Sequence, residues 1–506
     1  MKNDIIFLIF ERIKIDMSKG PKLNNITKNF TSRNSLGIDG VSNSIQRDLC
    51  PIVNTVTPRA FYWIFMVWNY YDYFINSGIS KENWNLKTFD KPFLKKNDYY
   101  FILSNLLNDN SDRMNLVGKD KASADIKNNL DGFYEYNEQY FAARFGGMQY
   151  FNAGCLSMGF ITDRNNDERR YNFPRITETI GKPMAIAFEE IIKNTEYYKR
   201  YRLTNRKVPK DVLEELGKVL SLNLNGFDKC KDLLRKALFD PKKNINLDNT
   251  KLIQSAEYIK LLHEKFDYKY TDLKGMRKIL YEYFSPRGEF KYTYNGELKE
   301  IMRDWEIVVG RQYFSISIEL IWKYMLSILN TPESLEKWIE NSLNSSKWSI
   351  DINKNLDNYI AKCKFSFEER EEMIRKGYRA SKDIDFNIEN AIKVLLSIYN
   401  RFKDRSELNQ NYLELGGEIS IKGLIDLVEK YKEKPVYEFI GYIMKKWIID
   451  QHKIIAFDKM MSGRDGYYFE CIDNIYIRKA IPEPEYQGIR LIQLNQVMKD
   501  LDMWSE

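Results

Sequence analysis

Histidine and cysteine are scarce in this chain of 506 residues. With only His263 and His452 present, a histidine-rich metal site, a two-histidine zinc helix and a histidine-centred nuclease finger are all hard to build. The cysteines are odd in number and far apart, with no pair at metal-ligand or redox spacing: Cys50, Cys155, Cys230, Cys363 and Cys471. This usage predicts a reducing cytoplasm, no disulfide framework and no resident cofactor, with metal binding left only to carboxylates.

Long apolar runs are also missing. The run Ile5–Phe10 is six residues long and is followed by charged residues, so it is shorter than a membrane span or the usual core of a signal peptide. Met17 offers an alternative start, which leaves open whether residues 1–16 belong to the native protein. The Gly-x-x-x-x-Gly-Lys-Ser/Thr phosphate loop is absent, which excludes an ATPase of that class. We expect no membrane partner.

The most informative segment that is present is rich in aromatic residues. Nine of the fourteen positions from Phe61 to Phe74 are aromatic, and apolar side chains cover almost the whole circumference of the predicted helix. Thr57 and Pro58 supply a cap and a proline at the first helical position. Because Asn69 and Asp72 interrupt the run well before about 20 residues, we predict a buried core helix whose two polar side chains must find partners.

Helical periodicity dominates the rest of the chain and predicts a mainly α, multidomain protein with small β-hairpins. A net charge of +7, from 78 basic and 71 acidic residues, gives only a mild indication of anionic partners. The predicted units are an N-terminal helical domain, a winged-helix-like domain, a helical domain with a hairpin at 289–301, and a C-terminal α+β unit, at residues 1–130, 131–210, 211–430 and 431–506.

Two hairpins are predicted from alternation around turn residues. Residues 289–301 alternate on either side of Asn295-Gly296, a type I′ turn signal. Residues 467–471 and 475–479 alternate around Asp473-Asn474, between a helix that starts at Pro435 and a final helix, Ile489–Leu501. A further helix is expected to start at Thr331-Pro332.

Residues 140–192 resemble a winged helix. Gly159 permits a helix exit, Phe160 and Ile161 begin a strand, residues 163–170 form the tip of the wing, and Tyr171 and Phe173 return toward the core. In that fold a helix that starts at Thr177 closes the unit. Because Pro183 would lie too deep in such a helix, we predict that the helix restarts at Pro183.

Basic residues gather in and after the predicted wing. Four arginines lie in the wing, and a run in which basic residues alternate with tyrosines follows, a pattern that suits phosphates and stacked bases. The candidate nucleic-acid ligands are Arg164, Arg169, Arg170, Arg175, Lys199, Arg200, Arg202, Arg206 and Lys207. The alternative is a solvated turn paired with nearby carboxylates and a helix end, and winged helices also dock proteins.

A weaker pattern allows a metal-dependent nuclease. Asp272, Glu289 and Lys291 have the spacing of an Asp followed by Glu-x-Lys, which would hold Mg²⁺ and orient water. Glu297-Leu298-Lys299 repeats the pattern, so ordinary exposed strand residues explain it equally.

Three passages together resemble large, poorly characterised bacterial proteins encoded beside restriction or anti-phage defence genes. These passages run from Ser35 to Tyr62, from Leu156 to Phe188, and from His452 to Asp465 with Asp500-Leu501. The resemblance implies a cytoplasmic component of a defence system that binds DNA, RNA or a partner protein of the same system through its winged unit. A carboxylate-metal nuclease effector and a purely protein-binding scaffold are the alternatives.

Overall fold

The computed structural model describes most of the chain. The described residues are 34–51, 60–76, 91–108, 118–129, 131–140, 154–156, 158–162, 175–204, 206–220, 224–240, 249–265, 272–284, 291, 296–379, 388–461, 466–484 and 486–503.

Helices form most of the structure, as the periodicity predicts, and the strands are few and short. The helices are α2 (Asp39–Leu49), α3 (Ala60–Asn76), α4 (Lys91–Leu107), α5 (Lys119–Asn128), α7 (Gly181–Ile192), η3 (Tyr197–Tyr201), α8 (Lys210–Val219), α9 (Asp228–Phe239), α10 (Thr250–Lys265), α11 (Leu273–Glu282), α12 (Lys299–Ile328), α13 (Leu335–Asn344), α14 (Asp357–Ile360), α15 (Phe367–Arg379), α16 (Ile388–Phe402), α17 (Gln410–Glu414), α18 (Ile421–Tyr431), α19 (Val436–Tyr442), η5 (Ile443–Asp450), α20 (Gln451–Met461) and α21 (Arg490–Asp500). The strands are β1 (Phe133–Tyr134), β2 (Ile161–Thr162), β3 (Arg175–Ile176), β4 (Val208–Pro209), β5 (Glu333–Ser334), β6 (Phe469–Ile472) and β7 (Ile475–Arg478).

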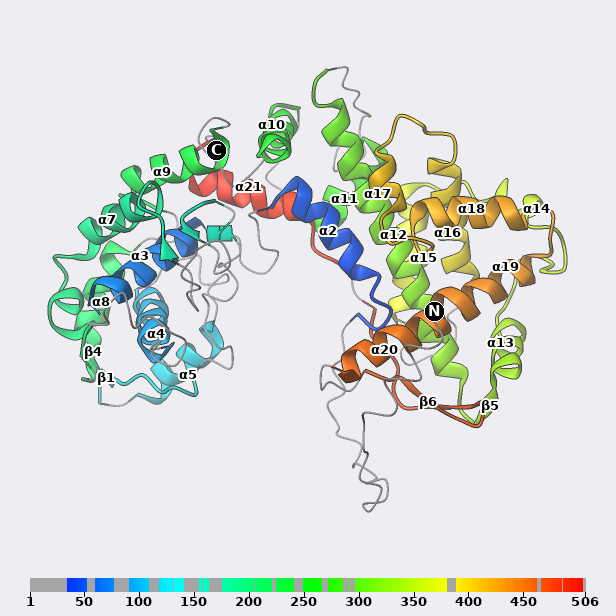
Figure 1. The fold of residues 1–506 in the computed structure, drawn as a ribbon, viewed down its shortest axis with the longest axis horizontal. Helices are drawn as coiled ribbons and strands as arrows, with labels where there is room; N and C mark the ends of the chain where they lie inside the picture. Colours follow the sequence, from blue (N-terminus) through cyan, green and yellow to red (C-terminus); the bar gives the residue numbers. More distant parts are fainter. Residues whose placement is uncertain are drawn as a thin grey trace, which may run out of the picture.

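The elements gather in two lobes joined by α2 and α21 (Figure 1). One lobe contains α3 to α9, and the other is built around α12. The ends of α2 and α21 are tied together, because the Gln46 side chain accepts from the Arg490 N–H at 2.7 Å and donates to the Gly488 carbonyl at 3.1 Å. Among the described helices, none combines the length and apolar character that crossing a bilayer requires.

The aromatic helix α3 is the core of the first lobe, which confirms its predicted burial. Its side chains from Ala60 to Tyr70 are at most 3% exposed. Phe65 stacks on Phe101 of α4 with ring centroids 4.1 Å apart, and Trp68 packs on Phe188 of α7 at 5.5 Å. Thr57 and Pro58 lie outside the described residues. Aromatic packing from α4 and α7 therefore contributes to the burial of α3 from Ala60 to Tyr70.

The second lobe is organised around α12, a helix of 30 residues that is buried along almost its whole length. Helices α2, α11, α13, α16 and η5 pack around it. The sequence of α12 has no continuous polar face, as expected for a helix that neighbours surround on all sides.

The C-terminal hairpin is confirmed, and it belongs to a larger sheet than predicted. Strands β6 and β7 pair antiparallel around Asp473 and Asn474, whose φ angles of 49° and 63° fit the predicted turn. β5 adds to the other edge of β7, so the strand order is β5-β7-β6. The helix expected to start at Thr331-Pro332 instead starts at Leu335, because Ser334 caps α13 by accepting from the Lys337 N–H.

The hairpin predicted at 289–301 is wrong in its second arm. Lys299, Glu300 and Ile301 form the first turn of α12, where Ile301 is buried at 1% exposure. In the first arm, Lys291 bridges to Phe284; residues 285–290 and 292–295 lie outside the described residues. The apolar periodicity of α12 extends back to Ile301 and overrides the local alternation.

The helix that follows the predicted wing starts at Gly181, two residues before the predicted restart at Pro183. Proline is tolerated here because its position lies in the first turn. The Thr177 hydroxyl accepts from the Gly181 N–H at 2.9 Å and donates to the Gly159 carbonyl at 2.7 Å, so Thr177 fixes the entry into the helix.

Candidate functional site

The base of the predicted wing is a short antiparallel pair. Ile161 pairs with Ile176, and Thr162 pairs with Arg175. This pairing brings together the two ends of the segment 163–174. Arg164, Arg169 and Arg170 lie in that segment, outside the described residues.

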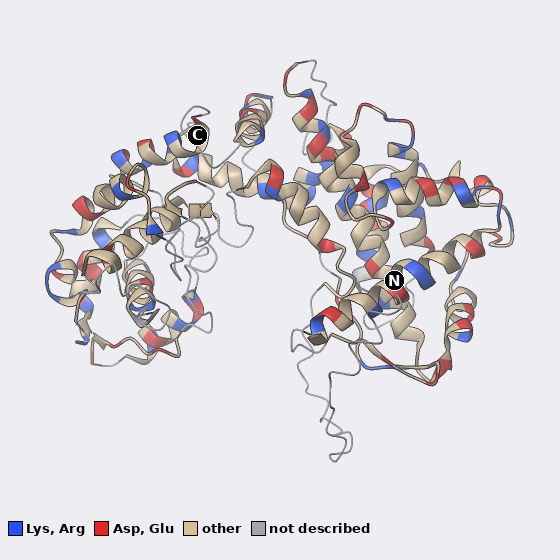
Figure 2. Ribbon diagram, in the orientation of Figure 1, with Lys and Arg blue, Asp and Glu red and all other residues tan. Residues whose placement is uncertain are grey.

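Three of the basic residues that follow the wing contact neighbouring oxygens. Lys199 donates to the Asn194 carbonyl at 2.7 Å. Arg200 pairs with Glu196 at 2.8 Å, and Lys207 pairs with Glu135 at 3.6 Å. Arg206 is exposed. Figure 2 shows acidic residues interspersed with basic ones along the helices of both lobes.

Arg202 differs from its neighbours because it is buried. Its guanidinium forms an ion pair with Asp72 of α3, and it stacks on the Tyr198 ring at 3.8 Å. Burial lowers the pKa of Arg202 to about 10. In this position Arg202 does not face solvent, so we remove it from the set of nucleic-acid ligands predicted from the sequence.

Asn69 also finds the partners that its burial requires. It donates to the Leu94 carbonyl at 3.0 Å and accepts from the Asn97 amide at 2.8 Å. The Tyr197 hydroxyl donates to Asn97 at 2.9 Å. The polar strip of α3 is thus an internal connection from α3 to α4 and η3.

The carboxylate pattern of the nuclease alternative is only partly described. Asp272 caps α11 by accepting from the Gly275 N–H at 2.7 Å, and Lys291 lies in an isolated bridge. Glu289 lies outside the described residues. In the part of the chain that the structure covers, no three His, Cys, Asp or Glu side chains gather as metal ligands.

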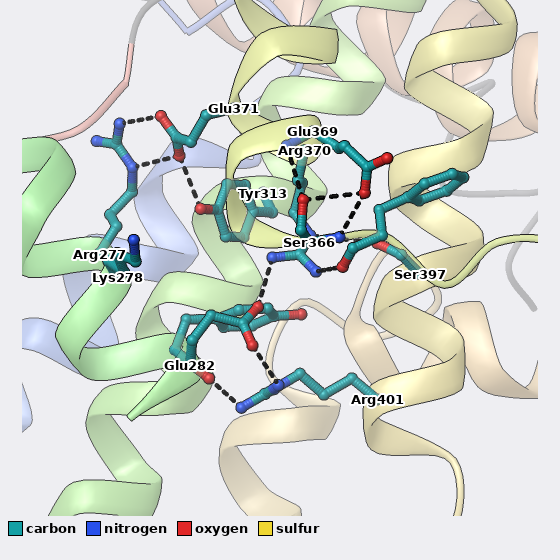
Figure 3. A network of polar contacts seen from close by, with 12 residues as sticks. Arg277, Lys278, Glu282, Tyr313, Ser366, Glu369, Arg370, Glu371, Ser397 and Arg401 are labelled. Atoms are coloured by element: carbon teal, nitrogen blue, oxygen red, sulfur yellow. Dashed lines mark hydrogen bonds and ion pairs between the residues drawn. The ribbon is translucent and has the colours of Figure 1, made fainter. Parts of the chain in front are cut away.

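A network of charged side chains connects α11, α12, α15 and α16 (Figure 3). Arg277 binds Glu371 through two nitrogens, at 2.9 and 2.7 Å, and the Tyr313 hydroxyl donates to the same carboxylate at 2.7 Å. Arg370 and Arg401 both contact Glu282, at 2.8 and 3.5 Å. Each of these arginines has a carboxylate partner, so the network ties the four helices together.

A groove lies between α20 and the edge strand β6. Its volume is about 820 Å³, and its walls include Ile454 and Phe457 from α20 and residues 469–472 from β6. Ile454, Phe457 and Met461 share one face of α20 and are 58%, 51% and 68% exposed. Ile472 of β6 is 57% exposed. Tyr467 also lines the groove, and charges of both signs come from Lys453, Asp458, Glu470 and Lys479.

The groove was not predicted from the sequence. The sequence feature that could have indicated it is the spacing of Ile454, Phe457 and Met461, which places them on one helix face, but such a face is equally typical of a core helix. Only the structure shows that this face of α20 is exposed and that β6 lies opposite it.

Comparison of the chain with protein-family models, with curated proteins and with solved structures finds no match. The function must therefore be argued from the residues themselves.

Proposed function

We propose that the chain is a protein-binding scaffold that takes an extended segment of a partner protein into the groove between α20 and β6. The observation that carries the proposal is the exposed apolar face of α20 beside an edge strand. Large apolar side chains that gather on a surface mark interaction sites, whereas singly scattered ones do not.

The shape of the groove selects an extended occupant. Within the described sheet β6 is an edge strand, and such a strand offers main-chain donors and acceptors to an added strand. Alternate side chains of that added strand would point toward Ile454 and Phe457. The partner segment is therefore expected to carry apolar side chains at every second position, flanked by charges of either sign that match the rim.

A library of random ten-residue peptides tests this proposal. We expect the wild-type protein to select peptides with alternating apolar residues, and we expect Phe457→Glu to weaken their binding by about tenfold or more, as for a central apolar anchor. Leu203→Glu is the matched control, because Leu203 is also about half exposed, at 51%, but follows η3, which contacts α8 of the first lobe.

Cys471 provides a second readout, since it lines the groove and is the one exposed cysteine of the five. Burial raises the pKa of Cys50, Cys230 and Cys363 to about 12, so alkylation of the folded protein should occur at Cys471. A bound peptide should slow that alkylation. Peptides that bind Phe457→Glu equally well, or that leave Cys471 unprotected, would contradict the proposal.

We propose nucleic-acid binding as a second candidate function, supported by the paired base of the predicted wing. The β2–β3 pair brings together the residues on either side of 163–174, a stretch of the sequence that carries three arginines. A winged helix and a role in bacterial defence stay predictions of the sequence. Changing Arg169 and Arg170 to Glu should weaken DNA binding and lower its log–log salt slope by roughly 0.9 for each lost phosphate contact. An unchanged salt slope would show that these two arginines do not contact DNA phosphates, and would contradict the proposal that the wing binds DNA.

A further inference from the structure

A second cavity has walls from the start of α2, from α12, from the 416–419 loop and from the η5–α20 helix. Its volume is about 470 Å³, within the range of small-molecule sites. Gly37, Arg311, Gly416 and Trp447 are among its lining residues.

Arg311 is the unusual member of this lining. Arg311 is 1% exposed, and none of its three guanidinium nitrogens has a hydrogen-bond partner among the described residues. The guanidinium lies over the Phe314 ring at 4.6 Å, a contact that leaves its N–H groups unused. Burial lowers the pKa of Arg311 to about 9, so the group is still a cation at neutral pH.

The acidic groups of the cavity do not neutralise Arg311. Asp450 pairs with Lys446 at 2.9 Å. Glu418 accepts from the Tyr442 hydroxyl and from the Trp447 indole N–H. Asp39 acts on Arg311 electrostatically, and no hydrogen bond joins the two in the described residues. A buried guanidinium without an acceptor is costly, so the site favours a ligand that supplies oxygens.

The backbone around Arg311 keeps this space open. Gly416 has a φ of 104°, and a Cβ at this position would lie 3.1 Å from Nη2 of Arg311. Gly37 and Ile38, which precede α2, and Val41 in its first turn belong to the same wall, and the N-terminus of a helix favours negative charge.

We propose that this cavity binds a small oxyanion, either a phosphate or a carboxylate group, with Arg311 as the residue that binds it. The site is separate from the groove of the proposed function, although Ile454 lines both. Nothing in the proposal depends on a partner protein.

Thermal unfolding of the full chain tests the proposal with inorganic phosphate, acetate and potassium chloride at equal ionic strength. We expect phosphate or acetate, but not chloride, to raise Tm with a saturable dependence on concentration. The anion that raises Tm shows whether the cavity prefers a phosphate or a carboxylate group. Arg311→Met should weaken the binding of that anion by about tenfold or more, as expected for loss of a charged hydrogen bond.

Two comparisons separate ligand binding from a structural role of Arg311. Without ligand, Arg311→Met should unfold at the same temperature as the wild type or higher, because a buried charge without an acceptor has been removed. Arg303→Met is the matched control on the same helix, since Arg303 pairs with Glu407 at 3.8 Å outside the cavity. The absence of a saturable response in the wild type, or an equal response in Arg311→Met, would overturn the proposal.

Discussion

At the scale of single residues, burial separates side chains that look alike in the sequence. Arg200 and Arg202 belong to one basic run, yet the Arg200 side chain is 75% exposed and the Arg202 side chain 10%. One is a surface cation, and the other neutralises Asp72 in the interior of the first lobe.

This difference predicts unequal effects on stability. Asp72→Ala should lower the free energy of unfolding by about 3–5 kcal/mol, because Arg202 would be left buried without its partner. Arg200→Met, the matched control, should change it by less than about 1 kcal/mol, as for an exposed ion pair. Urea denaturation of the three proteins measures both values. Equal losses would contradict the structural role of the buried pair.

At the scale of elements, His452 joins three segments. Its Nδ1 lies 3.0 Å from the Ser35 carbonyl, and its Nε2 accepts from the Tyr468 N–H at 3.1 Å. The Trp322 ring of α12 lies 5.0 Å from the imidazole. These contacts require a neutral ring that donates from Nδ1, and burial lowers the pKa of His452 to about 4.

Stability should therefore depend on pH. The unfolded state binds a proton at a pKa near 6.5 and the folded state only near 4, so the contribution of His452 is complete above pH 6.5 and is lost as the pH falls toward 4. The loss amounts to about 3 kcal/mol at most. Asp304 acts in the opposite direction, because burial raises its pKa to about 6.

Comparing the wild type with His452→Gln in urea at several pH values isolates this contribution. The variant should be less stable at pH 7.5, and the difference between the two proteins should shrink as the pH falls from 6.5 to 4.5. A constant difference would show that His452 does not change its protonation between the folded and unfolded states.

At the scale of the whole molecule, α21 connects the two lobes. The Asp500 carboxylate accepts from the N–H of Ala60, the first residue of α3, at 3.3 Å. Leu501 accepts from the Arg235 side chain at 2.7 Å. The end of α21 thus contacts the first lobe, while its start is tied to α2, which packs on α12.

Asp500→Ala tests this connection. It should lower the free energy of unfolding by about 1–2 kcal/mol, as for loss of a helix cap. It should also separate the unfolding of the two lobes into two transitions in urea. Asp426→Ala is the control, because Asp426 is 61% exposed and pairs with Lys422 on one helix, α18. A single transition in Asp500→Ala, with unchanged stability, would show that the lobes do not depend on this cap.

Local pattern alone determined much of the secondary structure. The aromatic helix at Phe61–Phe74, the final helix at Ile489–Leu501 and the turn at Asp473-Asn474 were predictable because helix period and turn chemistry depend on residues a few positions apart. Burial of Asn69 and Asp72 also followed from the sequence, since no polar face was left for them.

Tertiary structure decided which side chains meet. Arg202 reaches Asp72 across 130 positions, and Ile301 joins the core of α12 instead of a hairpin. The exposed face of α20, and the guanidinium of Arg311 that has no hydrogen-bond partner among the described residues, both depend on which elements lie beside them. Ion pairs, grooves and cavities depend on packing between distant segments, and periodicity along the chain carries no information about that packing.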